Sequence, residues 1–430
     1  MQLKSILKKI YTKDYLILIC IGFLPLLWKI LEIVFVSNYE NALKILGQIS
    51  LISIIFKIFE ESLLNPLYKT LSKQNYENEN NKNLIAKKFL IYYTLSTIIF
   101  SLALFLLTKE ILTISQVPEH IFEETLKFIK LYIIASGFGV ISKYLYTFSL
   151  LNKDTKKMIV YFLLKSAATA MLFLCLVPKF TVGLGVYGIA ISELIINICA
   201  LLFFIFSLPK TKKTKIRMNS REYIKLFIIA LLETLIRNVV YYFVILVFLN
   251  TLDNQDLYFI SNEFIWCVML VPTLAQSSLI KQELANNKNT SLKPYFINGI
   301  FLNLFIVVLI PVALLVFKYV YALNNYLDFF IVLLKLLPCY ILFIFDSIVE
   351  SYFISSGKMH HILIQSIITN ILVYLTALIL FLCNIWTITL NSIILLFNLG
   401  VIISSIYTIA VFCITKNKNN EKIKLKTNHS

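Results

Sequence analysis

The sequence predicts an all-α polytopic membrane protein with twelve transmembrane helices, arranged as two pseudo-symmetric six-helix bundles around a central cavity. Three observations lead to this fold class. Hydrophobic residues make up 59% of the 430 residues and the mean hydropathy is +0.82, more apolar surface than a soluble chain of this length can bury. Long apolar stretches recur between short polar breaks. The two halves of the chain also echo each other in sequence.

The apolar stretches have the length of membrane-spanning helices, which need about 20 residues to cross the hydrocarbon core. Polar segments separate them, such as "SKQNYENENNKN" at 72–83 and "PKTKKTKIRMNSRE" at 209–222. No cleavable signal peptide is expected, because the first apolar segment is too long for one. The twelve predicted spans are 15–37, 45–68, 84–107, 124–150, 157–178, 184–208, 222–249, 256–280, 295–320, 327–355, 361–384 and 388–414.

The basic residues predict the orientation of these spans. The chain has 40 Lys and Arg against 23 Asp and Glu, and most of the basic residues lie in the termini and in the loops on one side. The positive-inside rule therefore places both termini in the cytoplasm. We expect a monomeric multi-pass protein of a bacterial inner (plasma) membrane. The basic residues lie between apolar segments, which argues against nucleic acid as a partner.

A weak internal repeat relates the two halves of the chain. "TKDYLILICIGFLPLLWKILEIVFVS" at 12–37 aligns with "SREYIKLFIIALLETLIRNVVYYFVI" at 220–245, so that Lys29 matches Arg237. Six spans per half keep the two repeats parallel, which predicts a pseudo-two-fold axis along the membrane normal and a cavity between two lobes. The predicted domains are an N-terminal lobe at 1–208, a cytoplasmic linker at 209–221, a C-terminal lobe at 222–415 and a basic cytoplasmic tail at 416–430.

Four acidic residues inside the spans are candidates for coupling transport to an ion. A charge at the centre of a membrane helix costs about 2.5–3.5 kcal/mol on insertion scales, so it is a functional candidate by default. The four are Glu32, Glu233, Glu263 and Asp346. Asp346 is spaced i,i+4 from Glu350, which puts two like charges on one helix face. Glu263 has two alternatives, a position facing the cavity or a solvated position near the outer interface.

Local ion pairs are the alternative explanation for two of these acids. Lys29 and Glu32 are spaced i,i+3, and Glu233 and Arg237 are spaced i,i+4, so each pair shares a helix face. Pro25 removes one backbone hydrogen bond from the first span and could allow that helix to bend, although a static kink is an equal alternative.

Several basic and aromatic side chains are candidates for lining the substrate cavity. They are Lys29, Arg237, Lys165, Tyr241 and Trp266. For the aromatic residues, packing or a position at the membrane interface is the competing explanation. For Lys165 the competing explanation is that its ammonium group reaches the membrane surface along its own stem, which we also expect of Lys143 and Lys335.

Cofactor and metal sites are not expected. The seven cysteines lie in or beside apolar runs without metal-ligand spacing, and we expect them to be small buried hydrophobic residues. The sequence has no P-loop and no nucleophile–base pattern, which argues against an enzyme. Na⁺ or H⁺ is the only expected cofactor, as a coupling ion.

Four segments carry a resemblance to a known family: "EIVFVS" (32–37), "EILTISQVPEHIFEETLKFIKLYII" (110–134), "LLNKDTKKMIVYF" (150–162) and "GLGVYGIAISE" (183–193). In their order and spacing the sequence resembles the MATE family of the multidrug/oligosaccharidyl-lipid/polysaccharide (MOP) exporter superfamily. The resemblance implies an exporter that alternates between inward- and outward-facing states, with Glu32 in place of the family's first-helix Asp. The segment "KSAATAMLFLCLVP" (165–178) departs from the family, since it carries Lys165 where drug exporters often carry acids.

Two functions are compatible with these features. The first is a MATE-type secondary active exporter of amphipathic compounds, coupled to H⁺ or Na⁺ antiport. The alternative is a MOP-type flippase for a lipid-linked oligosaccharide or polysaccharide precursor, whose pyrophosphate would be held by Lys29, Arg237 and Lys165. A membrane scaffold without transport activity is disfavoured by the charges inside the spans.

Overall fold

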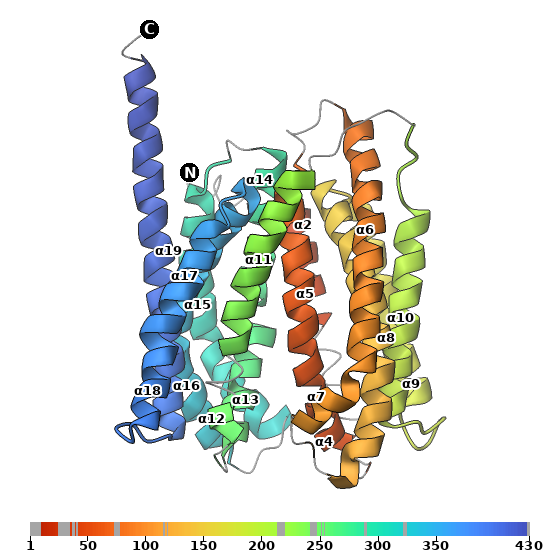
Figure 1. The fold of residues 1–430 in the computed structure, drawn as a ribbon. Helices are drawn as coiled ribbons and strands as arrows, with labels where there is room; N and C mark the ends of the chain where they lie inside the picture. Colours follow the sequence, from red (N-terminus) through yellow and green to blue (C-terminus); the bar gives the residue numbers. More distant parts are fainter. Residues whose placement is uncertain are drawn as a thin grey trace. The chain divides into compact units, whose positions relative to one another are not determined.

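The computed structural model is all-helical over the residues it describes (Figure 1). These residues are 10–24, 35–36, 39, 42–72, 78–114, 117, 119–212, 220–240, 247–250, 252, 254–287, 290–320 and 325–427. The chain divides into two compact units. One is Phe23–Ile224, and the other combines Met1–Gly22 with Lys225–Ser430.

The unit of Phe23–Ile224 is built around one long central helix, α8, which packs against α5, α6 and α10. Lys82 at the beginning of α6 donates a hydrogen bond to Asn152 Oδ1 just after the end of α8, at 2.7 Å. This contact therefore fixes the beginning of α6 beside the end of α8. The helices of this unit are α4 (Ala42–Gly47), α5 (Ile49–Thr70), α6 (Glu79–Leu106), α7 (Thr108–Ile114), α8 (Glu119–Leu151), α9 (Thr155–Leu176) and α10 (Val186–Phe206).

The other unit is built around α16, which packs against α13, α14, α15 and α19. Its first helix, α2, is tied to α14 by Tyr15, whose hydroxyl donates to Pro272 O at 3.1 Å. The helices of this unit are α2 (Lys13–Gly22), α11 (Ser220–Val240), which begins at the boundary, α12 (Val247–Asn250), α13 (Gln255–Phe264), η3 (Ile265–Met269), α14 (Val271–Asn286), α15 (Lys293–Leu315), η4 (Val316–Val320), α16 (Tyr326–Ser356), α17 (His360–Thr369), η5 (Asn370–Leu375), α18 (Thr376–Leu382) and α19 (Leu390–Thr427).

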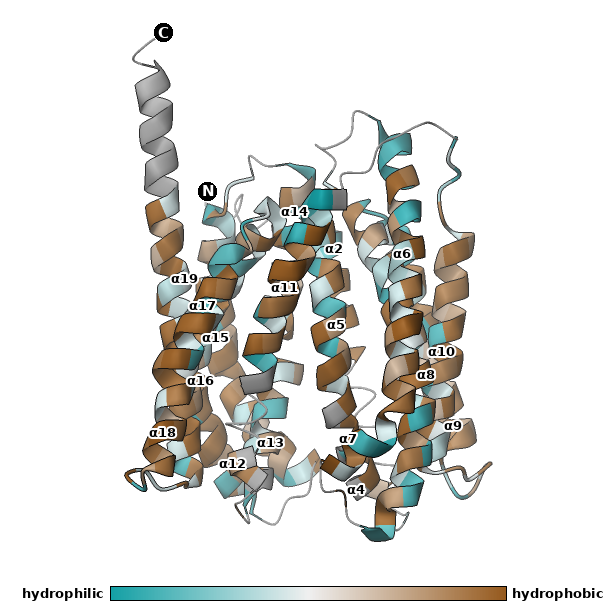
Figure 2. Ribbon diagram, in the orientation of Figure 1, coloured by the Kyte–Doolittle hydropathy of each residue, from teal (hydrophilic) through white to brown (hydrophobic). Residues whose placement is uncertain are grey.

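Eight helices in the described part of the chain are long and apolar enough to cross a membrane. A ninth is added if Leu257–Met269 and Val271–Asn286, which meet at 51°, form one broken span. The break falls where Pro272 cannot continue the hydrogen-bond ladder of the π-helix η3. These helices begin and end within a few residues of the predicted spans from 84–107 to 388–414. Figure 2 shows hydrophobic residues along most of α6, with hydrophilic residues gathered at its first turns.

The predicted spans at 45–68 and 222–249 correspond to helices that carry several charges. Helix α5 carries Lys57, Glu60 and Glu61, and α11 carries Glu233 and Arg237. Composition alone therefore does not mark either helix as membrane-spanning. The span at 15–37 lies largely outside the described residues.

The exposed surface of the helices is apolar where a soluble protein would be polar. Along α6, Ile91, Leu95, Ile99 and Leu102 form one face, and each is 53–68% exposed. A contiguous apolar stripe of this kind is stable when it faces lipid rather than water. The exposed stripes and the apolar spans together make the chain a multi-pass membrane protein.

The cysteines do not follow the prediction that they are buried. Cys339 is buried, but Cys20, Cys175, Cys199, Cys383 and Cys413 are exposed on the helices. The correction has a simple physical reason: a thiol is apolar enough to face lipid, so an apolar sequence context does not distinguish the lipid-facing side from the core.

A glycine-rich turn sets how closely α9 and α10 approach. Gly183 and Gly185 have φ values of 74° and 55°, in a region that side chains rarely adopt. At Gly188 a Cβ would lie 2.8 Å from Leu176 O, a backbone atom that cannot rotate away. The segment "GLGVYGIAISE" therefore owes its glycines to a tight turn and a close helix contact.

Gly188→Ala is expected to destabilise the protein by about 1–3 kcal/mol, the usual cost of forcing an extra methyl group into a packed contact. The matched control is Gly139→Ala, where the nearest atom is the side-chain Nδ2 of Asn197. Thermal unfolding of the detergent-purified variants measures both. Equal loss in the two variants would contradict the packing explanation.

Candidate functional site

A buried ion pair lies on α11 in the unit of Lys225–Ser430. Arg237 Nε lies 3.3 Å from Glu233 Oε1, with the side chains 44% and 6% exposed. Ser366 on α17 donates a hydrogen bond to the same Glu233 oxygen at 3.2 Å. The predicted i,i+4 pair is confirmed. It explains how two charges lie inside an apolar helix, because each lowers the cost of burying the other.

Asp346 on α16 is the second buried acid of this unit, with 2% exposure. Its Oδ2 accepts hydrogen bonds from Ser404 and Ser405 on α19, both at 3.4 Å. Its Oδ1 is buried and has no hydrogen-bond partner among the described atoms. A carboxylate oxygen in this situation is costly unless it is protonated or bound by a cation.

Hydrogen bonds and one step along the α17 backbone connect the two acids. Gln365, next to Ser366 on α17, donates to Ser404 Oγ, and Ser404 donates in turn to Asp346. The polar path therefore runs from Glu233 through Gln365–Ser366 and Ser404 to Asp346. We did not predict this path from the sequence. The serine and glutamine residues inside otherwise apolar spans are the sequence feature that could have indicated it.

Glu350 joins the same group one turn beyond Asp346. It interacts electrostatically with Asp346, Glu233, Arg237 and Lys281, so the predicted i,i+4 neighbours do share a site. We call these five residues the carboxylate cluster: Glu233, Asp346, Glu350, Arg237 and Lys281. With every group ionised, its three acids exceed its two bases by one charge, which one monovalent cation balances.

Glu263 and Trp266 occupy different surroundings. Glu263 lies on α13 with an exposed side chain, unlike Glu233 and Asp346. Trp266 in η3 packs edge-to-face against Tyr340 and Phe343, with ring centroids 6.0 and 5.3 Å away. Trp266 is thus part of the aromatic core of its unit, which was the competing explanation for it.

The unit of Phe23–Ile224 holds a second group of charges. Lys143 Nζ on α8 lies 2.5 Å from Glu60 Oε1 on α5, so Lys143 does not simply extend toward the membrane surface as expected. Lys165 on α9 donates a hydrogen bond to the Tyr161 hydroxyl at 3.2 Å. Lys335, in the other unit, is exposed and donates to Asn391 Oδ1 at 2.7 Å.

Four predicted site residues lie outside the described residues: Pro25, Lys29, Glu32 and Tyr241. Within the described residues, no group of three or more His, Cys, Asp or Glu side chains is arranged to hold a metal ion.

Sequence comparison finds no matching family model and no matching curated protein. Comparison of structures finds similar folds at low identity. A MOP superfamily transporter from Pyrococcus furiosus, described as having a binding pocket of reverse polarity, is 14% identical with a TM-score of 0.76 over 92% of this chain and 93% of that one. A MATE transporter of Vibrio cholerae is 15% identical with a TM-score of 0.76 over 97% and 98%.

A MATE crystal structure in the straight conformation is 13% identical, with a TM-score of 0.77 over 97% of both chains. At these identities the similarity defines the architecture rather than the activity. The resemblance seen in the sequence motifs is confirmed at that level: the chain is a multi-pass membrane protein with the fold of the MATE transporters of the MOP superfamily.

Proposed function

We propose that the chain is a MATE-type secondary active exporter, which moves amphipathic compounds across the membrane by alternating access coupled to H⁺ or Na⁺ antiport. The observation that carries the proposal is the carboxylate cluster. Ser366 donates to the buried acid of α11 and Ser404 to the buried acid of α16, and one buried oxygen of Asp346 has no partner among the described atoms.

The cluster has the chemistry of a site for one small cation. A proton on Asp346 or a Na⁺ bound among its carboxylate and the hydroxyls of Ser404 and Ser405 would neutralise the excess negative charge. Oxygen atoms alone can bind either ion. The cost of keeping several charges inside a membrane protein favours a functional role over a purely structural one.

The proposal includes the twelve-span, two-lobe architecture predicted from the internal repeat. Alternating access needs two bodies that can rearrange around a binding site near the middle of the membrane. Glu32 is proposed as a further coupling residue on the strength of the resemblance alone, and Glu263 stays a prediction because its exposure separates it from the buried acids.

The lipid-linked oligosaccharide flippase is not favoured. Arg237, one of the three cations that were to hold a pyrophosphate, is in an ion pair with Glu233. The neighbouring carboxylate cancels the positive charge that this arginine would offer to a pyrophosphate.

Transport by the full chain in proteoliposomes tests the proposal. At zero membrane potential, a tenfold Na⁺ or H⁺ gradient supplies about 1.4 kcal/mol per ion. It should therefore sustain about tenfold accumulation of an amphipathic dye for one-to-one exchange. We expect accumulation with one of the two gradients and its loss when an ionophore dissipates that gradient. Dye movement that ignores both gradients would contradict ion coupling.

A further inference from the structure

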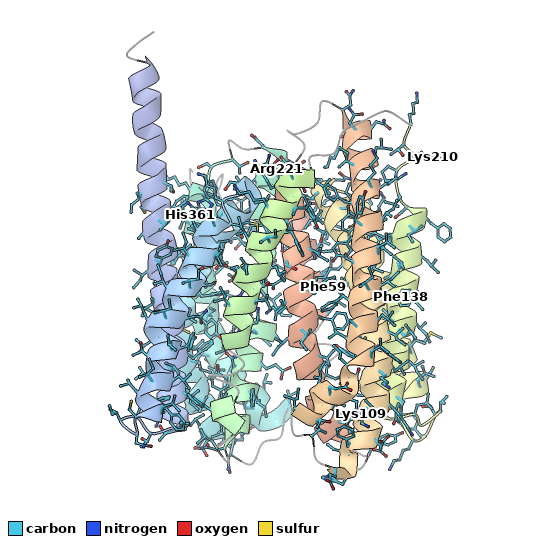
Figure 3. The ribbon with its side chains drawn as sticks, viewed as in Figure 1. Phe59, Lys109, Phe138, Lys210, Arg221 and His361 are labelled. Atoms are coloured by element: carbon cyan, nitrogen blue, oxygen red, sulfur yellow. The ribbon has the colours of Figure 1, made fainter. Side chains whose placement is uncertain are left out.

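Three charged residues of the unit Phe23–Ile224 lie at similar distances from the ends of their helices. Lys143 lies eight residues before the end of α8, and Glu60 lies ten residues before the end of α5, which places them about 12 and 15 Å from those ends. Lys165 lies ten residues after the start of α9, also about 15 Å in. A turn of three residues joins α8 to α9, so the two lysines are measured from the same side. Figure 3 labels Phe59, the residue before Glu60, on α5.

Contacts bring both lysines to the same pair of aromatic rings. Lys165 Nζ lies 3.2 Å from the Tyr161 hydroxyl and 5.6 Å from the centre of its ring. Lys143 lies three residues before Tyr146 on α8, on the same helix face, and the Tyr146 ring lies 5.7 Å from that of Tyr161. The two lysines therefore flank this pair of rings.

The Glu60 contact leaves Lys143 with further capacity to bind. A lysine ammonium group has three N–H donors, and the ion pair with Glu60 occupies one direction. The Lys143 side chain remains 54% exposed, whereas that of Glu60 is only 17% exposed. Glu60 thus fixes the ammonium group in position while leaving it accessible to a second acceptor.

An apolar wall adjoins these charges. The Tyr161 ring lies 4.9 Å from the ring of Phe204 on α10 and 5.7 Å from that of Tyr146 on α8. Tyr161 and Phe204 are buried and support the Tyr146 ring, which is partly exposed. Fixed cations beside such a ring suit an amphipathic molecule with an anionic group at one end of an apolar body.

A purely structural role explains this arrangement less well. An ion pair buried in a protein contributes about as much to stability as apolar residues of the same volume, so stability alone gives no reason for an accessible ammonium group at this depth. A ligand that supplies a carboxylate gains a charge-assisted hydrogen bond, which is about twice as strong as a neutral one.

We propose that Lys143 and Lys165 form an anion-binding site for the exported compound, and that this site selects amphipathic carboxylates with an aromatic or alkyl body packed on Tyr146, the partly exposed ring of this aromatic group. Glu60 positions Lys143 for this contact. The inference rests on the proposed export function, whose substrate class it specifies.

Equilibrium binding tests the inference without any ion gradient. The purified full chain in lipid nanodiscs is titrated with 1-naphthaleneacetate and with its neutral amide, and empty nanodiscs provide the blank. We expect the carboxylate to bind about tenfold or more tightly than the amide, as for loss of one hydrogen bond to a charged group. Equal affinity for the two compounds would overturn the inference. It would leave the transport proposal standing, because that is measured separately under gradients.

The variants are chosen so that the fold is preserved. The pair Glu60→Gln with Lys143→Gln removes both charges together, and Lys165→Gln removes the second ammonium group. Each should abolish most of the preference for the carboxylate, and Lys143→Arg should retain it. Lys335→Gln, at an exposed lysine of the other unit, is the matched control and should change nothing. A preference that survives in both neutralised variants would refute the site.

Geranyl pyrophosphate provides the remaining comparison. The Glu60 carboxylate beside Lys143 repels a second negative charge, so this site should bind it no more tightly than 1-naphthaleneacetate. Markedly tighter binding of the pyrophosphate would overturn the proposed substrate class and return the chain to the flippase hypothesis.

Discussion

Asp346→Asn is expected to reduce gradient-driven export at least about tenfold, corresponding to loss of an ionic contact of about 1.5–3 kcal/mol. The substitution preserves shape and can still accept hydrogen bonds from Ser404 and Ser405. The asparagine, however, can neither bind a proton nor present a full negative charge to Na⁺. Because the variant retains its packing, its loss of function should not be accompanied by loss of folded protein. The measurement is dye accumulation in proteoliposomes under an imposed gradient.

Asp328→Asn is the matched control for this experiment. Asp328 lies in the first turn of the same helix, α16, but its side chain is exposed. Its replacement should leave export within about twofold of the unmodified protein, since a surface substitution of this kind changes free energies by about 0.5 kcal/mol or less. If Asp346→Asn also exports normally, the carboxylate cluster is not the coupling site.

The parts of this molecule that depend on local sequence were predictable. The spans from 84–107 onward, apart from 222–249, follow from hydropathy alone, because each must present an apolar surface to lipid over its whole length. The Glu233–Arg237 pair follows from the helical repeat, because residues four apart share a face.

The parts that depend on tertiary packing were not predictable. Glu60 and Lys143 lie 83 residues apart in the sequence, on different helices, and no periodic pattern relates them. The serines that bind Asp346 come from α19, and "SS" within an apolar helix is compatible with many orientations. The π-helical segments η3, η4 and η5 are similarly decided by packing, because their sequences are as apolar as the α-helices around them.

The two charge groups differ in a way that suits separate tasks. In the carboxylate cluster acids exceed bases, and the unpartnered oxygen belongs to an acid. Near Tyr161, Lys165 donates to the phenol hydroxyl. In the Lys143–Glu60 ion pair the lysine is the more exposed member. Under the two proposals above, a cation would bind in one unit of the chain and an anionic compound in the other.

The last prediction concerns the ion pair on α11. Arg237→Met is expected to lower the free energy of unfolding by about 2 kcal/mol, below the 3–5 kcal/mol typical of breaking a fully buried pair. The reduction reflects the 44% exposure of the arginine side chain, which water already stabilises in part. Glu233, at 6% exposure, is left with the hydrogen bond from Ser366 and must be protonated or remain charged in a poorly solvated position.

A double-mutant cycle separates the pair from the individual side chains. Glu233→Gln combined with Arg237→Met should recover most of the stability lost in Arg237→Met, because the glutamine is neutral and still accepts from Ser366. Arg221→Met in the exposed first turn of α11 (Figure 3) is the control and should be neutral. Unfolding in mixed micelles, followed by tryptophan fluorescence, gives all the required values. Strictly additive losses from Glu233→Gln and Arg237→Met would show that the two side chains contribute independently, and the cost of an unpaired Glu233 would then have no physical basis.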